Sequence, residues 1–125
     1  MNETWDTLNS LLTEKGVLII AVPNCSSYDA KKYGAYWAAY DVPRHLWHFT
    51  PGTIQRLGAK HEFILAARHP MPFDAFYVSM LSEKYMGHSM SFFRGILSGT
   101  LAWFSALASK ERSSSMIYVF RKKQK

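Results

Sequence analysis

The sequence predicts an α/β fold. Three short apolar runs, at residues 17–22, 63–68 and 116–120, have the composition of strands, and helical periodicity fills much of the chain around them. The first run is continuously apolar and four of its six residues are β-branched, which is typical of a strand covered on both faces of a parallel sheet. The predicted order is helix, strand, loop, helix, strand, two or three helical pieces and a last strand.

The first predicted element is a helix near the N-terminus. Asn2 is suited to cap its start, and Gly16 is suited to end it in a left-handed conformation. Its apolar side chains recur at spacings of three and four residues: Trp5, Leu8, Leu11 and Leu12.

The segment after the first strand is first polar and then aromatic. Residues 24–36 carry serines and lysines and predict a loop with one helical turn. Residues 36–50 combine aromatic side chains with an acid, an arginine and two histidines. A loop of this kind at the end of a buried strand is where α/β proteins usually bind their ligands. This loop is therefore the strongest functional signal in the chain.

The remaining elements follow from capping and turn residues. Thr50 and Pro51 predict the start of a helix that ends near residues 58–60. Residues 76–108 are helical and apolar, with a break near Gly87 and further breaks at Gly95 or Gly99 as an alternative. We expect one domain in three parts: core strands and active-site loop (1–75), a helical insertion or lid (76–110), and the last strand with a basic tail (111–125).

Composition limits the classes of function. A chain of 125 residues fits one domain, and its one cysteine excludes an intrachain disulfide framework, which favours a reducing, cytoplasmic setting. The net charge is +6, but basic residues crowd the last five positions, which indicates a basic tail and no nucleic-acid surface. The first residues lack the pattern of a signal peptide. We therefore expect a cytoplasmic protein without a nucleic-acid partner.

A longer pattern links the first strand to the loop. It runs from Gly16 through the apolar strand to Pro23-Asn24, then to Trp37, Asp41, Pro43-Arg44-His45-Leu46 and His48-Phe49-Thr50. This pattern resembles the C-terminal half of class I S-adenosylmethionine-dependent methyltransferases, in the broad type 11/23-like branch, and covers about residues 8–68. The resemblance implies a partial Rossmann-like methyltransferase sheet. The three predicted strands would be the fifth, sixth and seventh of that fold, whose last strand is inserted antiparallel.

The resemblance also implies a cofactor, S-adenosylmethionine, in the intact enzyme. The family binds it through a glycine-rich turn after its first strand and an acidic residue after its second. The residues ahead of Val17 contain no such turn. We therefore expect this chain to be the C-terminal portion of such an enzyme, with no cofactor binding or activity of its own.

Two histidines in the loop are candidate catalytic residues. His45 or His48 can accept a proton from an acceptor hydroxyl or amine near neutral pH. The alternative is that both rings hydrogen-bond the backbone and only fix the loop. Their spacing, with Asp41 nearby, could suggest a metal site, but the other candidate ligands nearby in sequence, His69 and Asp74, have no recognised spacing, so we predict no metal.

Five further residues are candidates for binding a small-molecule or lipid-like acceptor. Arg44 is suited to hold a carboxylate or phosphate, or else to pair with Asp41. The aromatic side chains are suited to line a pocket or, alternatively, to pack a core or lid. Asn24 follows the strand directly, where it either contacts substrate or makes an ordinary turn. The candidates are Asn24, Trp37, Tyr40, Asp41 and Arg44.

The helical insertion has an apolar face with Arg94 and Lys110 at its flanks. Its most apolar part, residues 96–108, is shorter than the roughly 20 residues needed to span a membrane. A substrate lid or dimer helix is the favoured use, and attachment to a membrane surface is the alternative. The face consists of Phe92, Phe93, Ile96, Leu97, Leu101, Phe104 and Leu107.

The first strand also predicts association. A doubly buried strand without a neighbour leaves an open edge and uncovered faces, which proteins rarely tolerate. We expect a homodimer, formed by edge pairing or by the apolar face of residues 92–107, or a complex with the missing N-terminal half. A non-catalytic module that binds itself or a partner is the competing function.

Overall fold

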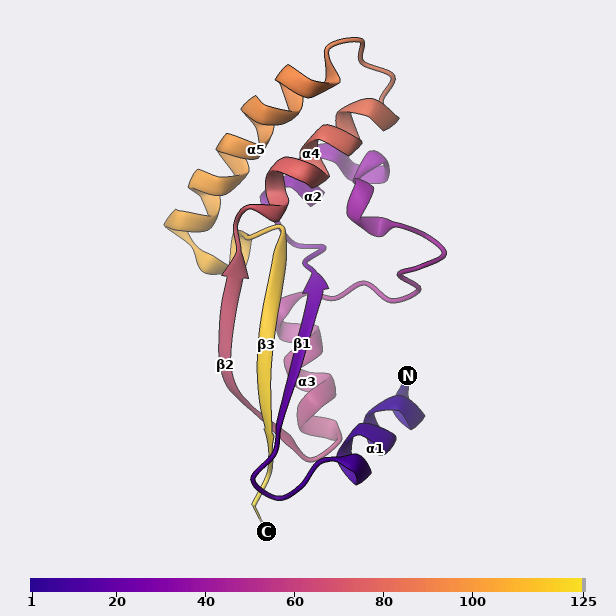
Figure 1. Cartoon of the computed structure of the whole chain (residues 1–125), viewed down its shortest axis with the longest axis vertical. Coiled ribbons are helices and arrows are strands. Elements are labelled where there is room, and N and C mark those ends of the chain that lie inside the picture. Colours follow the sequence, from indigo (N-terminus) through magenta and orange to yellow (C-terminus); the bar gives the residue numbers. More distant parts are fainter. Residues whose placement is uncertain (125) are drawn as a thin grey trace.

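The computed structural model describes residues 1–124 as a mixed α/β fold. Its sheet has three strands in the order β1-β3-β2, and β3 is antiparallel to both neighbours. β1 and β2 therefore run in the same direction with the last strand between them (Figure 1). All three predicted strands are present: β1 (Val17–Pro23), β2 (Phe63–Met71) and β3 (Ser115–Lys122).

Five α-helices accompany the sheet within the described residues. Three short 3₁₀ turns lie at Gly34–Tyr36, Ala38–Tyr40 and Lys110–Arg112. The helices are α1 (Asn2–Leu11), α2 (Tyr28–Tyr33), α3 (Pro51–Lys60), α4 (Asp74–Tyr85) and α5 (Ser91–Ala108).

One face of the sheet packs against α1 and α3 and forms the main core. Trp5 of α1 makes edge contacts with Phe63 and Phe120, at ring distances of 5.6 and 5.5 Å. Ile54 of α3 joins this cluster. The predicted start of α3 is confirmed, because the Thr50 hydroxyl accepts a hydrogen bond from the Thr53 N–H at 3.2 Å and Pro51 follows it.

The opposite face of the sheet is only partly covered. Along β1 exposed residues alternate with half-buried ones, and Ile19 is 65% exposed. The prediction that this strand is covered on both faces is therefore wrong for residues 1–124. The physical reason is its position, because β1 lies at an edge of the sheet and the helices that pack on it cover one face.

Two details of the predicted helices are also wrong. α1 ends at Leu11, and Gly16 has no left-handed φ, so it is not a helix stop. Residues 24–36 hold more structure than one turn, because the Ser27 hydroxyl caps a six-residue helix by accepting from the Ala30 N–H at 3.1 Å.

α4 and α5 form a helical hairpin beyond the ends of β1 and β2 (Figure 1). The predicted break at Gly87 is confirmed, and its φ of 76° explains the glycine. α5 continues through the two other glycines, because both face α4. A Cβ on Gly95 would lie 2.5 Å from the Met80 Cα, and one on Gly99 would lie 2.8 Å from the Phe76 Cα.

Candidate functional site

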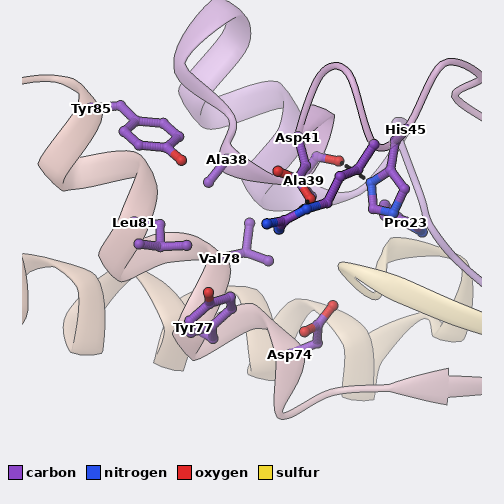
Figure 2. A pocket seen from close by; sticks show the side chains of 11 residues that line it. Pro23, Ala38, Ala39, Asp41, His45, Asp74, Tyr77, Val78, Leu81 and Tyr85 are labelled. Atoms are coloured by element: carbon purple, nitrogen blue, oxygen red, sulfur yellow. Dashed lines mark hydrogen bonds and ion pairs between the residues drawn. The ribbon is translucent and has the colours of Figure 1, made fainter.

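The loop after β1 and the helix α4 enclose a cavity of about 300 Å³. Figure 2 shows side chains from both elements directed toward it. The loop side contributes Pro23, Ala38, Ala39, Asp41, Arg44 and His45, and α4 contributes Asp74, Tyr77, Val78, Leu81 and Tyr85.

Backbone contacts hold the loop in place at both ends. Asp41 adopts a left-handed conformation with φ 38°, and its carbonyl accepts a hydrogen bond from the His45 N–H at 3.1 Å. At the far end, Phe49 pairs with Asn24 in an isolated bridge and its carbonyl accepts from the Cys25 N–H at 3.0 Å. The loop therefore closes back on the end of β1 and presents its middle to α4.

His45 is the loop histidine that lines the cavity. Its Nδ1 lies 3.2 Å from the Ala39 carbonyl oxygen. A carbonyl oxygen can only accept a hydrogen bond, so Nδ1 carries the proton in the neutral ring and Nε2 keeps its lone pair. This arrangement leaves one ring nitrogen able to accept a proton.

His48 lies outside the lining of this cavity. Its Nε2 is 2.9 Å from the Tyr40 carbonyl oxygen, and its ring packs edge-on against Tyr40 at 4.9 Å. Tyr40 in turn packs edge-on against the buried Trp37 at 5.1 Å. The Trp37 Nε1 donates a hydrogen bond to Asp29 at 2.8 Å. These contacts support the loop from behind.

Asn24 is also placed as a supporting residue. It is fully buried, and its Nδ2 donates to the carbonyl oxygens of Glu111 and Ser113 at 2.7 and 3.0 Å. Its Oδ1 accepts from the N–H and the hydroxyl of Ser26 at 3.1 and 2.7 Å. The amide thus has no donor or acceptor left for a substrate in this arrangement.

Asp41 and Arg44 form an ion pair at the cavity, with 3.3 Å between Arg44 Nη1 and Asp41 Oδ2. The Arg44 side chain is largely exposed. An exposed pair of this kind contributes at most about 1 kcal/mol. Arg44 can therefore exchange this partner for an anionic group on a ligand at little cost.

The sequence predicted a helical insertion or lid over residues 76–110, but no residue of α4 was singled out as part of the site. Tyr77, Leu81 and Tyr85 recur every four residues, which places them on one side of the helix. Asp74 begins the helix and accepts a hydrogen bond from the Ser115 hydroxyl. The four-residue spacing was visible in the sequence, but nothing in it indicated that this side faces the loop.

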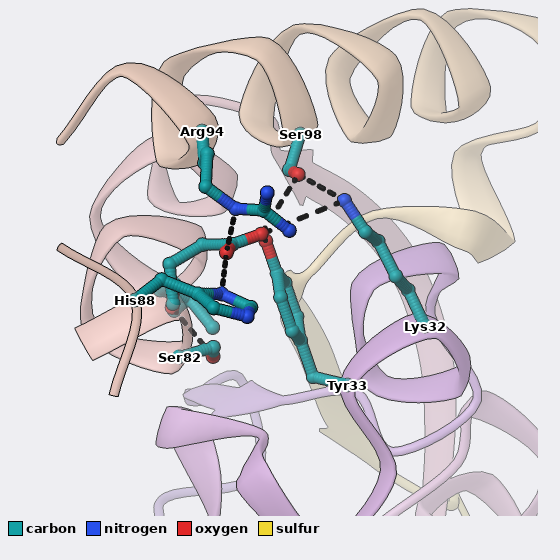
Figure 3. Close-up of polar contacts among 8 residues, drawn as sticks. Lys32, Tyr33, Ser82, His88, Arg94 and Ser98 are labelled. Carbon is teal, nitrogen blue, oxygen red and sulfur yellow. Dashed lines mark hydrogen bonds and ion pairs between the residues drawn. The ribbon is translucent and has the colours of Figure 1, made fainter. Parts of the chain in front are cut away.

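Glu83 is a second group that the sequence did not single out. Its buried carboxylate accepts hydrogen bonds from Tyr33 Oη at 3.0 Å, His88 Nδ1 at 2.6 Å and Arg94 Nε at 2.8 Å. Lys32 lies 3.8 Å away. Figure 3 shows that these partners come from α2, α5 and the turn between α4 and α5. The carboxylate therefore joins three helices behind the cavity wall.

The contacts of Glu83 change its ionisation. Burial acts to raise the pKa of this carboxyl, but hydrogen bonds from Arg94, His88 and Tyr33 and the charge of Arg94 outweigh it and lower the pKa to about 2. Burial raises the pKa of Tyr33 to about 12. Glu83 is thus a stable anion at neutral pH.

In residues 1–124 no group of three or more His, Cys, Asp or Glu side chains is placed to hold a metal ion. Within the same range no helix is long and apolar enough to cross a membrane. No family model, curated protein or solved structure matches the chain.

Proposed function

We propose that this chain is the acceptor-binding, C-terminal portion of an S-adenosylmethionine-dependent methyltransferase. The observation that carries the proposal is the sheet order. β3 lies antiparallel between β1 and β2, as expected if the three strands correspond to the fifth, seventh and sixth strands of that fold. The loop with Pro43-Arg44-His45-Leu46 begins at the carboxyl end of β1, where open α/β sheets bind their ligands.

The cavity supports the acceptor role. A volume of about 300 Å³ is at the lower end of small-molecule sites. Its wall combines apolar and aromatic side chains of α4 with the carboxylates of Asp41 and Asp74 and the guanidinium of Arg44. A small acceptor with an apolar body and a hydroxyl or amine group would find both kinds of partner there.

His45 is the residue that we assign as general base. A hydroxyl or amine loses a proton when it is methylated, and a positioned imidazole accepts it. Nε2 is the nitrogen left free by the hydrogen bond from Nδ1 to Ala39. His48, the other predicted candidate, packs against Tyr40 and fits a role in supporting the loop better.

The cofactor itself does not fit the residues of this chain. β1 is followed by Asn24-Cys25 and β2 by Pro72-Phe73, so neither strand leads into a glycine-rich turn. The chain offers instead an open β1 edge and an exposed apolar strand face. We therefore propose that a separate segment binds the cofactor and packs against β1.

Reconstitution tests this proposal. The DNA ahead of the Met1 codon is read for a segment with a glycine-rich turn between a strand and a helix. Isothermal titration then measures S-adenosylhomocysteine binding to this chain, to that segment and to the two together. We expect micromolar binding only with the cofactor segment present. Absence of any such segment, or binding that this chain does not influence, would contradict the proposal.

Two variants of the reconstituted protein separate the histidines. His45→Ala should lower methyl transfer by about 100-fold or more and leave S-adenosylhomocysteine affinity unchanged. His48→Ala should act mainly by loosening the loop, because His48 contacts the Tyr40 ring and carbonyl. Equal losses of activity in the two variants would argue against His45 as the base.

The second candidate function is a non-catalytic module that binds itself or a partner. The open edge of β1 and the 65% exposure of Ile19 favour it. The two functions differ in which residues matter. For a binding module, changes at His45 leave function intact and changes on the β1 face abolish it.

A further inference from the structure

Helix α5 carries its large and small side chains on opposite sides. The side that packs against α4 and α2 holds small residues: Gly95, Ser98, Gly99, Ala102 and Ala106. The opposite side, the α5 apolar face, consists of the exposed residues Phe92, Phe93, Ile96, Leu97, Leu101, Phe104 and Leu107. In a helix that serves only the core of its own domain, the large apolar side chains would point inward.

The α5 apolar face extends along most of the helix. Eighteen residues make a helix of about 27 Å. Thr100 lies within this stripe, and its hydroxyl donates to the Ile96 carbonyl at 2.9 Å, so its only O–H donor is already satisfied. The surface is therefore suited to an apolar environment along its length.

The charged side chains around this face are mainly cationic. From Lys84 to Lys110 the sequence contains three Lys or Arg residues and no Asp or Glu. The acids that border this stretch are already paired, Glu83 with Arg94 and Glu111 with Arg68. Lys84 and Lys110 are exposed, and Arg94 is exposed beyond the Nε that binds Glu83. A partner with negative charge at the edge of an apolar layer would match both features.

A second copy of this helix matches less well. Antiparallel packing of two α5 helices about a two-fold axis would bring Arg94 of one copy near Lys110 of the other. Parallel packing would bring identical cations together. Of the two bordering carboxylates, Glu83 is buried and Glu111 already pairs with Arg68, so neither is free to pair with a cation of the second copy.

We infer that the α5 apolar face docks on an anionic lipid bilayer, with the helix lying in the plane of the interface. The aromatic and leucine side chains would enter the boundary between headgroups and acyl chains, and the flanking cations would contact lipid phosphates. The rest of the domain supplies the polar side that an isolated interfacial helix would need. This inference does not depend on the proposed methyltransferase function.

Vesicle sedimentation with the whole chain tests the inference. One set of vesicles contains only phosphatidylcholine, and a second contains about one third phosphatidylglycerol. We expect the chain to pellet with the anionic vesicles and to be released as salt rises from about 0.05 to 0.5 M. No binding to the anionic vesicles would overturn the inference.

Substitutions locate the surface. The double variant Leu97→Glu, Phe104→Glu should weaken vesicle binding by about tenfold or more, because both side chains are exposed on this face and a carboxylate there opposes entry into the lipid. Leu11→Glu is the matched control, since Leu11 is 76% and Leu97 66% exposed. Lys84→Gln and Lys110→Gln should each weaken binding to anionic vesicles by about fivefold.

Light scattering on the same variants tests the competing occupant. If Leu97→Glu, Phe104→Glu lowers the mass in solution, a second copy covers this face and the inference is wrong. An unchanged mass together with lost vesicle binding supports it. Circular dichroism confirms that each variant keeps its helices, so that loss of binding is not loss of fold.

Discussion

At the scale of single residues, three helices meet at the carboxylate of Glu83. It is buried, and cationic or neutral donors from α2, α5 and the α4–α5 turn surround it. Removing one partner of a buried charged network leaves the others unsatisfied, which costs more than the network contributes net. Glu83 therefore holds the hairpin at a fixed position behind the cavity wall.

The lowered pKa of Glu83 predicts how stability depends on pH. Its folded pKa of about 2 lies below the ordinary value of 4.5, so the charged form is favoured by folding. This contribution is complete above about pH 4.5 and is lost as the pH falls from there toward 2. Glu83→Gln should therefore cost about 2–3 kcal/mol at pH 7 and much less near pH 3.

Urea unfolding of wild type and variant across this pH range measures the difference. Glu14→Gln is the control, because Glu14 is an exposed carboxylate 3.7 Å from Lys122 and such surface pairs contribute under about 1 kcal/mol. A cost of Glu83→Gln that stays constant from pH 7 to pH 3 would contradict the assignment.

Sequence reasoning singled out a loop that lines a cavity but could not assign every role in it. Asp41, Arg44 and His45 line the cavity, as the concentration of polar groups suggested. Asn24, which directly follows β1, was also a candidate, yet its Nδ2 donates to carbonyls as far away as Glu111, 87 positions along the chain. The same amide side chain can bind a substrate or hold the backbone. Only the distances to its hydrogen-bond partners in the folded chain show which of the two it does.

At the scale of elements, the packing of α4 on α5 depends on a close backbone approach. A Cβ on Gly95 would lie 2.5 Å from the Cα and 2.8 Å from the N of Met80. Backbone atoms cannot move aside without separating the helices. Gly95→Ala should thus destabilise the protein by about 1–3 kcal/mol, although alanine is the better helix former by about 1 kcal/mol.

Gly52 provides the matched control, because it lies in the first turn of α3 and a Cβ added there would have nothing within 4 Å. Gly52→Ala should stabilise by up to about 1 kcal/mol. The denaturation midpoints of the two variants compare the cost of disturbed helix packing with the gain in helix propensity. If both variants are stabilised, the close approach of α4 and α5 is not a tight constraint.

The boundaries of the strands and helices could be predicted only where the sequence signal has a single meaning. The three strands were located from short apolar runs, which are local signals, but β2 continues past the predicted residues 63–68 to Met71. The three glycines of the hairpin gave identical signals but serve two purposes. Gly87 adopts a positive φ just after the C-cap of α4, whereas Gly95 and Gly99 allow close packing inside a helix. One sequence cannot distinguish a glycine needed for its φ from one needed for its small size.

At the scale of the whole molecule, β1 has more apolar side chains than the rest of residues 1–124 bury. The sequence predicted burial on both faces, and the described residues cover one. The pattern and the structure are consistent if the second face meets something outside this chain. The uncovered face of β1 continues onto β3, where Val119 pairs with Ile19 and Ile117 pairs with Ala21.

This uncovered strand predicts association through β1. We expect the purified chain to have the mass of a dimer at micromolar concentration, since pairing would satisfy the free backbone groups of the edge and bury the exposed apolar side chains. Ile19→Lys should shift the chain to a monomer, because a charge at a 65% exposed position does not disturb the folded monomer but cannot be buried in the contact.

Leu11→Lys is the control for that experiment, since Leu11 is 76% exposed on α1, a different surface. Multi-angle light scattering gives the masses of four proteins: wild type, Ile19→Lys, Leu11→Lys and the double variant Leu97→Glu, Phe104→Glu. A wild-type monomer would mean that the edge is tolerated without self-pairing. A dimer that survives Ile19→Lys but not Leu97→Glu, Phe104→Glu would move the contact to α5 and exclude lipid docking there. Dissociation by Ile19→Lys alone would leave α5 free for a membrane while β1 joins the copies.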